Sequence, residues 1–334
     1  MPEDLRQPFV IGPDLIPPDD AGAVLDDALV AEADVVVLDV SGPGAVSCLQ
    51  GLLTCDIEKP GDGSYLYGGL LTPKGMLITD LWAGRGVGSV TLRVPRAGAG
   101  PMLEVLHRSL PPRLARVTDL SAEHGVLRLV GPAARDVAAR AGLAVPGEGH
   151  IASAVSGGIL AVVAQPPAGG PFALEILTSR ANTGPLRQRF ADAGARVGSA
   201  TALDLARALA GWPGLGAEID DRTLPQEVRF DELGGVSYTK GCYVGQETVA
   251  RLHFRGHANR HLRGLVWDEP PDPIDPSVSQ DDKPRGRVTS LLWVPTLEQW
   301  LGLGIVRREL DLDRPVLAGG QPATAVALPF ALAA

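Results

Sequence analysis

Short apolar runs bounded by turn residues recur along the chain and predict more strands than long helices. Residues 65–71 and 76–82 are two such runs, and the turn sequence Thr-Pro-Lys-Gly lies between them. Further strands are predicted at 35–40, 90–94, 115–120, 126–130, 159–164, 172–177, 261–267, 286–294 and 302–308, with a last hairpin over 315–330. This density of short elements is typical of a protein built mainly on β-sheets.

Helical periodicity is confined to a few segments. The apolar residues of 45–53 follow the i, i+3, i+4 spacing of one helix face, so we interpret Cys48 as a core residue and Ser41 as the N-cap. Other helices are predicted at 102–109, 133–141, 185–193 and 202–210. Because strands and helices mix without strict βαβ alternation, the pattern indicates an α+β fold with mostly antiparallel sheet.

The segment 268–284 holds five prolines and six acids and is predicted to be a loop. It interrupts a strand-rich segment, so we expect a small β domain over 250–334 that contains this loop. The α+β region over 20–249 precedes it. The 334 residues, 45% of them hydrophobic, are enough for two or three domains.

Charge and cysteine content narrow the functional class. A formal net charge of −9 disfavours strong nucleic-acid binding. The charge-free run 151–174 is broken by glycines and prolines, so we expect no membrane span. Cys48, Cys55 and Cys242 match no zinc spacing, and the acidic start lacks a signal peptide. We therefore expect a reduced, cytoplasmic protein without a metal site.

The densest candidate for chemistry is the segment 237–247. Cys242 lies between glycines, beside Lys240 and before a predicted helix, and a cation and a helix N-terminus both lower a thiol pKa. A surface turn with an incidental cysteine is the alternative, and the residues by themselves leave both open.

A basic stripe follows this segment. Four arginines and three histidines lie within 251–263 without an acid, and the default interpretation is the solvated rim of a hairpin. Arg251 and Arg255 are the candidates to bind an anion, either a ligand's carboxylates, a nucleic acid or a protein partner. The histidine spacing of i, i+4, i+8 would suit a metal only on a helix, and the neighbouring cations disfavour it.

The segment 240–247 resembles the signature of the YgfZ-type folate-binding proteins, relatives of the glycine cleavage T-protein. The matching residues are Lys240, Gly241, Cys242, Tyr243, Val244, Gly245, Gln246 and Glu247. Segments 49–75, 207–227, 286–290 and 328–330 also resemble that superfamily, so the resemblance covers residues 30–330. It implies a T-protein-like ring of three domains around a central tetrahydrofolate pocket, with a C-terminal antiparallel β-barrel.

The resemblance also implies site residues. Glu175 matches the carboxylate that binds the pteridine edge, and Asp80 is the one acid left where the T-protein has two. Arg251 and Arg255 would meet the glutamate tail of folate. Cys242, Lys240 and Asp80 are the candidate catalytic residues, with Cys242 as nucleophile, cluster contact or redox relay.

Three functions compete on these grounds. The first is a tetrahydrofolate-binding factor that supports assembly or repair of iron–sulfur client proteins. The second is a folate-dependent aminomethyl- or methyltransferase, for which the acid pair is incomplete. The third is an RNA-binding accessory protein, which the scarcity of aromatic residues, 4% of the chain, disfavours.

Overall fold

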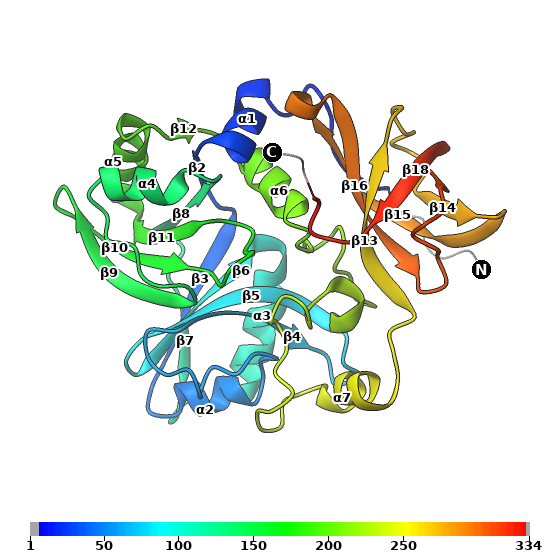
Figure 1. The fold of residues 1–334 in the computed structure, drawn as a ribbon. Helices are drawn as coiled ribbons and strands as arrows, with labels where there is room; N and C mark the ends of the chain where they lie inside the picture. The colour runs from blue at the N-terminus through cyan, green and yellow to red at the C-terminus, as the bar shows by residue number, and fades with distance from the viewer. Residues whose placement is uncertain (1–6, 332–334) are drawn as a thin grey trace.

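Three β-sheet lobes make up the protein in the computed structural model, which describes residues 7–331. Figure 1 shows the lobes arranged as a triangle, with the chain passing from one to another several times. The five-stranded sheet has the order β4-β5-β6-β3-β7 and the six-stranded sheet the order β12-β2-β8-β11-β10-β9. The third lobe is a barrel near the C-terminus.

The five-stranded sheet is antiparallel throughout. Its strands are β3 (Val35–Ser41), β4 (Tyr65–Leu71), β5 (Leu77–Arg85), β6 (Ser89–Pro95) and β7 (Arg116–Asp119). Two helices, α2 (Ala45–Gln50) and α3 (Arg96–Ser109), share a separate apolar core with it. The other face is left for contact with the remaining lobes.

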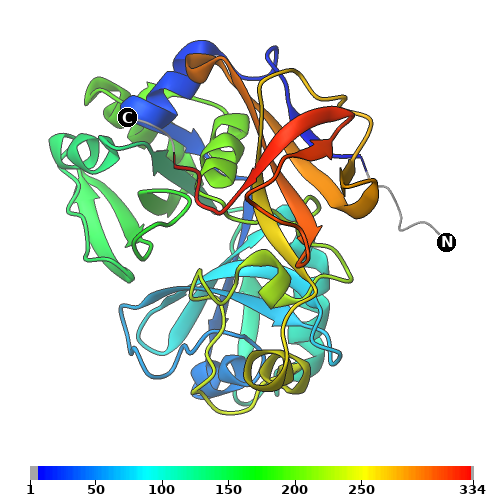
Figure 2. The same ribbon diagram turned by 45° about the vertical axis from the view of Figure 1, so that its right-hand side comes forward.

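The six-stranded sheet is antiparallel except at one edge, where β12 pairs parallel with β2. Its strands are β2 (Leu29–Glu32), β8 (His124–Val130), β9 (His150–Ser156), β10 (Ile159–Gln165), β11 (Leu174–Ser179) and β12 (Arg196–Val197). Helices α4 (Ala134–Arg140) and α5 (Arg180–Asp192) share its own apolar core. Figure 2 shows α6 (Ala200–Leu209) between this sheet and the barrel.

Six antiparallel strands close the barrel, because β15 pairs with both β14 and β16. They are β13 (Arg260–Trp267), β14 (Ser277–Gln280), β15 (Lys283–Val294), β16 (Gln299–Arg307), β17 (Val316–Ala318) and β18 (Gln321–Val326). Closure removes the free sheet edges that invite aggregation. From the other end of the chain, β1 (Phe9–Ile11) pairs parallel with β15.

One apolar cluster joins the three lobes. It contains Tyr67 and Trp82 of the five-stranded sheet, Leu177 of the six-stranded sheet and Leu303 of the barrel, all at least nine-tenths buried. The helix α1 (Pro18–Asp26) and α6 contribute to the same cluster. Burial of apolar surface therefore holds the lobes together as well as each lobe by itself.

The predicted α+β class and the C-terminal antiparallel barrel are confirmed, and two details are wrong. The helix α2 begins at Ala45 after Gly44, because the backbone of Ser41 is committed to pairing with Ser89 and Arg116. The segment 268–284 contains the strand β14, whose Val278 is buried in the barrel core. The buried residues of this strand are Val278 and the polar Gln280, so the apolar period among acids and prolines is too weak to reveal it.

Candidate functional site

A cavity of about 510 Å³ lies among the three lobes. Its wall comes from β4, β5, β6 and β8, from Phe172 before β11, from α6 and the loop 212–217, and from residues 7–9 beside the barrel. That volume falls in the usual range for a small-molecule site. Since the five- and six-stranded sheets, α6 and the segment beside the barrel all contribute to the wall, the cavity depends on how these parts pack together.

Aromatic rings form one part of the wall. Trp82 stacks on Trp212 with 5.4 Å between ring centroids, and Tyr67 meets Trp212 edge-on at 4.6 Å. Phe172 lies 5.2 Å from Trp82. All four residues line the cavity. Flat apolar surfaces of this kind suit a planar heteroaromatic ligand.

Asp80 on β5 is the most unusual polar group in the wall. The hydroxyl of Tyr67 donates to its Oδ2 at 3.3 Å, whereas its buried Oδ1 has no hydrogen-bond partner among residues 7–331. Burial raises the pKa of this carboxyl to about 6, against the opposing influence of Tyr67, Arg207 and Arg128. A buried acceptor left free is costly, so it is a natural point for a ligand to bind.

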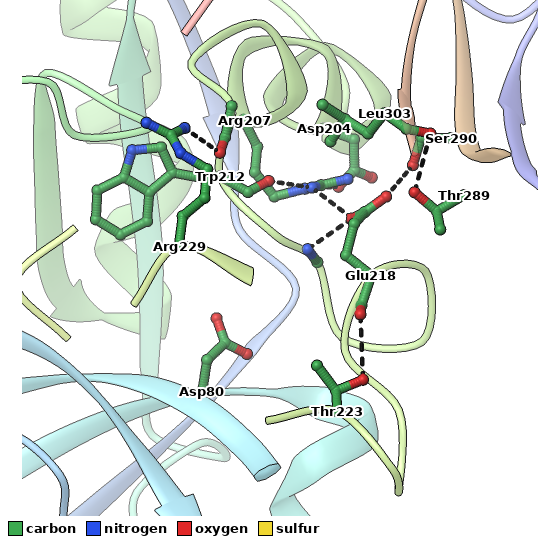
Figure 3. A network of polar contacts seen from close by, with 12 residues as sticks. Asp80, Asp204, Arg207, Trp212, Glu218, Thr223, Arg229, Thr289, Ser290 and Leu303 are labelled. Atoms are coloured by element: carbon green, nitrogen blue, oxygen red, sulfur yellow. Dashed lines mark hydrogen bonds and ion pairs between the residues drawn. The ribbon is translucent and has the colours of Figure 1, made fainter. Parts of the chain in front are cut away.

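Four arginines of the described residues line the cavity, and two of them, Arg128 and Arg207, donate hydrogen bonds to fully buried carboxylates. Arg128 on β8 donates to Oε2 of Glu175 through Nε at 3.0 Å and Nη2 at 2.8 Å. Arg207 on α6 donates from Nη1 to Oε2 of Glu218 at 3.1 Å and to the Trp212 carbonyl at 2.6 Å. Figure 3 shows Asp80 across from the Arg207–Glu218 pair. The wall therefore offers both a hydrogen-bond acceptor and donors.

Glu175, the carboxylate expected from sequence to bind the ligand, lies behind this wall. Its side chain is fully buried and also accepts from the hydroxyl of Tyr65 at 2.7 Å, and Nε of Arg93 is 3.0 Å away. Arg93 and Arg128 line the cavity, whereas Glu175 does not. Of the two candidate acids, the structure brings only Asp80 to the cavity surface.

Lys240 holds a neighbouring loop in place. Its Nζ donates to the carbonyls of Leu53 at 2.7 Å and Cys55 at 2.8 Å, in the segment after α2. Burial lowers the pKa of this ammonium to about 8. The Lys240 side chain is thus committed to the backbone of the first lobe.

The rest of the signature surrounds the start of α7 (Gln246–Arg255). Gly245 has a φ of 81°, and a side chain there would come within 2.5 Å of the Thr72 carbonyl, so only glycine fits against the β4–β5 turn. Tyr243 is buried, and burial raises its pKa to about 12. Gly241, Cys242 and Glu247 are exposed, and none of the signature residues lines the cavity.

Arg251 and Arg255 lie on the exposed face of α7, away from the cavity, and Phe254 between them is 66% exposed. The hairpin interpretation of this stripe is therefore wrong, because its first half is helix. The helix ends at Arg255, so the spacing of the histidines is not carried on one helical face. Within residues 7–331, no group of three metal-binding side chains is found.

Most of the cavity wall was not predicted from the sequence, and Arg128, Arg207 and Trp212 are the clearest examples. Arg207 and Trp212 lie in the segment 207–218 that carried part of the resemblance, which was the available signal. Arg128 had none, because an arginine within a strand most often points to solvent.

Comparison with known proteins gives consistent matches. The model of the GCVT N-terminal domain family matches residues 23–233. An aminomethyltransferase of Parafrankia sp. (strain EAN1pec) is 30% identical over 86% of this chain and 78% of its own length. The tRNA-modifying protein YgfZ of Serratia proteamaculans (strain 568) is 26% identical over 94% of this chain and 95% of its own.

Among solved structures, the glycine cleavage system aminomethyltransferase T from Bartonella henselae superposes with a TM-score of 0.78. The match covers 93% of this chain and 88% of that one at 20% identity. The predicted T-protein-like fold is thereby confirmed. Separately, in the part of the chain that the structure describes, no helix is long and apolar enough to cross a membrane.

The raised pKa of Asp80 predicts that Asp80→Asn increases the free energy of unfolding in a pH-dependent way. The carboxyl keeps its proton to about pH 6 in the folded protein but only to 3.8 when exposed, so its contribution to stability is lost as pH rises through 6. We expect the variant to exceed wild type by about 2–3 kcal/mol in free energy of unfolding at pH 8 and to match it at pH 4. Denaturant unfolding at both pH values, with the exposed Asp136→Asn as control, measures this. A difference independent of pH would contradict the assignment.

The two hydrogen bonds from Lys240 predict that Lys240→Met lowers the stability of the folded protein. Two carbonyls lose their donor, which should cost about 1–3 kcal/mol of unfolding free energy. Cys242→Ser, at an exposed position of the same turn, should stay within about 0.5 kcal/mol of wild type. Equal stability of the Met variant and wild type would show that these bonds contribute nothing.

Proposed function

The chain belongs to the GCVT N-terminal domain family, and from this membership and its cavity we propose that it binds a reduced folate. One observation carries the proposal: a buried carboxylate oxygen of Asp80 has no hydrogen-bond partner among residues 7–331, and four aromatic rings line the same cavity. The pterin ring of folate is planar and presents an amine and a lactam N–H side by side. A carboxylate accepts from both.

The remaining wall suits the rest of the pterin. The oxo group on that ring needs donors, and the guanidiniums of Arg128 and Arg207, which line the same cavity as Asp80, supply them. Trp82 and Trp212 stack on each other and, with Tyr67 and Phe172, give the ring an apolar aromatic wall. Glu175 acts in this arrangement through Arg128, which it holds toward the cavity.

We further propose that the protein supports iron–sulfur client proteins through a second face, formed by Cys242 and the outer side of α7. Support comes from position: Cys242 is exposed on a loop fixed by Lys240 and Gly245, and it lies away from the cavity. Arg251 and Arg255 then meet a client's acidic surface instead of the folate tail. Relatives with similar sequences carry the name tRNA-modifying protein YgfZ.

Aminomethyl transfer is the second candidate. It is favoured by Asp80, an acid with a pKa of about 6 inside the cavity, and by a relative named aminomethyltransferase. Incubation with aminomethylated lipoyl carrier protein and tetrahydrofolate separates the two candidates, because only a transferase releases ammonia.

The folate proposal predicts a specific loss of affinity on Asp80→Asn. One acceptor oxygen becomes a donor facing the pterin N–H groups, so the affinity for 5-formyltetrahydrofolate should fall by about 1.5–3 kcal/mol. Isothermal calorimetry at pH 7.5 measures it. Asp136→Asn, outside the cavity, should bind as wild type. Unchanged affinity in the Asp80 variant would remove Asp80 from the site.

The second face predicts that folate binding and client support separate. Cys242→Ser should bind folate as wild type, since the residue does not line the cavity, yet should fail to restore iron–sulfur enzyme activity in a deletion strain. In an alkylation time course, Cys242 should react before the half-buried Cys48 and the buried Cys55, whose pKa burial raises to about 11. Full rescue by the serine variant would reduce Cys242 to a surface residue.

A further inference from the structure

Glu218 is a fully buried carboxylate that does not line the cavity. Its side-chain hydrogen bonds connect residues of the cavity wall to the barrel. Its Oε2 accepts from the backbone N–H of Gly214 at 2.8 Å and from Arg207 at 3.1 Å. Its Oε1 accepts from the hydroxyl of Ser290 at 2.6 Å. Figure 3 shows these three bonds converging on the one side chain.

These partners come from three different parts of the fold. Arg207 lies on α6, Gly214 belongs to the loop that forms one cavity wall, and Ser290 is a buried residue of β15 in the barrel. Next to Ser290, the Thr289 hydroxyl donates to the Leu303 carbonyl at 3.0 Å, so this stretch of β15 is itself fixed. One carboxylate thus connects the barrel to the cavity wall.

The guanidinium of Arg207 contacts three acceptors. Its Nη1 is shared between Glu218 and the carbonyl of Trp212, and its Nε lies 3.5 Å from Asp204. The guanidinium borders the cavity and influences the titration of Asp80 there. Removing the carboxylate partner of a mostly buried arginine leaves its charge uncompensated, which favours contact with other nearby anions. Here those anions are Asp204 and Asp80.

We propose that Glu218 is a positioning residue for the ligand site. It holds Arg207 and the loop 212–217 against the cavity, and through Ser290 it makes their position depend on the barrel. The expected effect on affinity rests on the proposed folate binding. The expected position of Arg207 depends only on its contacts with Glu218. Without the negative charge of Glu218, Arg207 should move onto Asp80 and occupy the acceptor that the ligand needs.

Calorimetry on a set of variants tests this dependence. Glu218→Gln should lower the affinity for 5-formyltetrahydrofolate at least about tenfold, and Arg207→Met should lower it comparably. Because Glu218 acts through Arg207, the double variant should bind no more than about twofold more weakly than Arg207→Met alone. Additive losses, or wild-type affinity in Glu218→Gln, would overturn the proposal.

The chain offers a matched control. Glu227 is also a buried acid paired with an arginine, Arg260, at 2.8 and 3.0 Å, but neither residue lines the cavity. Glu227→Gln should therefore bind folate as wild type, even if it loses as much stability as Glu218→Gln. An equal loss of affinity in both variants would assign the effect to general destabilisation.

A second readout does not need the ligand. The pH midpoint of Asp80, measured by carboxyl NMR, should fall in Glu218→Gln because an uncompensated Arg207 favours the ionised carboxylate. If wild type binds no folate but the midpoint falls, the positioning role stands and the proposed function fails. An unchanged midpoint overturns the positioning role.

If Glu218→Gln does not fold, Ser290→Ala serves instead, with a smaller loss of affinity and no change in overall fold expected.

Discussion

Burial of charge is the constraint on which the cavity depends. Three carboxylates, Asp80, Glu175 and Glu218, lie around it away from bulk water, and each must be compensated to remain ionised. Glu175 is compensated by Arg93, Arg128 and Tyr65, and Glu218 by an arginine, a serine and a backbone N–H. Asp80 alone of the three keeps an oxygen without a hydrogen-bond partner among residues 7–331, and burial raises the pKa of its carboxyl.

The division of labour among these acids follows from where each one lies. Glu175 and Glu218 form hydrogen bonds inside the protein, and each orients an arginine toward the cavity. Asp80 lines the cavity and is the acid that can bind a ligand. Because Tyr67, Trp82 and Asp80 come from the five-stranded sheet, Arg128 from the six-stranded sheet and Arg207 from α6, no lobe forms the recognition surface or its charge balance alone. The apolar cluster shared by the three lobes fixes the position of these parts relative to one another.

Much of this arrangement was predictable from the sequence, and the reasons for the failures are physical. Periodicity located most strands, because period-2 patterning reports directly on which face is buried. The signature identified the turn around Gly245, where only glycine fits. The sequence pattern of Glu175 predicted a carboxylate within an apolar strand, but not the two arginines that neutralise it from other strands. These two arginines, Arg93 and Arg128, are distant from Glu175 in the sequence, so no local pattern around Glu175 indicates the pairing.

A crystal structure with bound 5-formyltetrahydrofolate would show whether Asp80 holds the pterin. We expect the pterin ring in the cavity among Tyr67, Trp82, Phe172 and Trp212. Its amine and lactam N–H groups should lie within hydrogen-bond distance of Asp80, and Glu175 should still be paired to Arg128. A pterin bound directly to Glu175, with Arg128 displaced, would contradict this expectation, as would a folate bound outside the cavity.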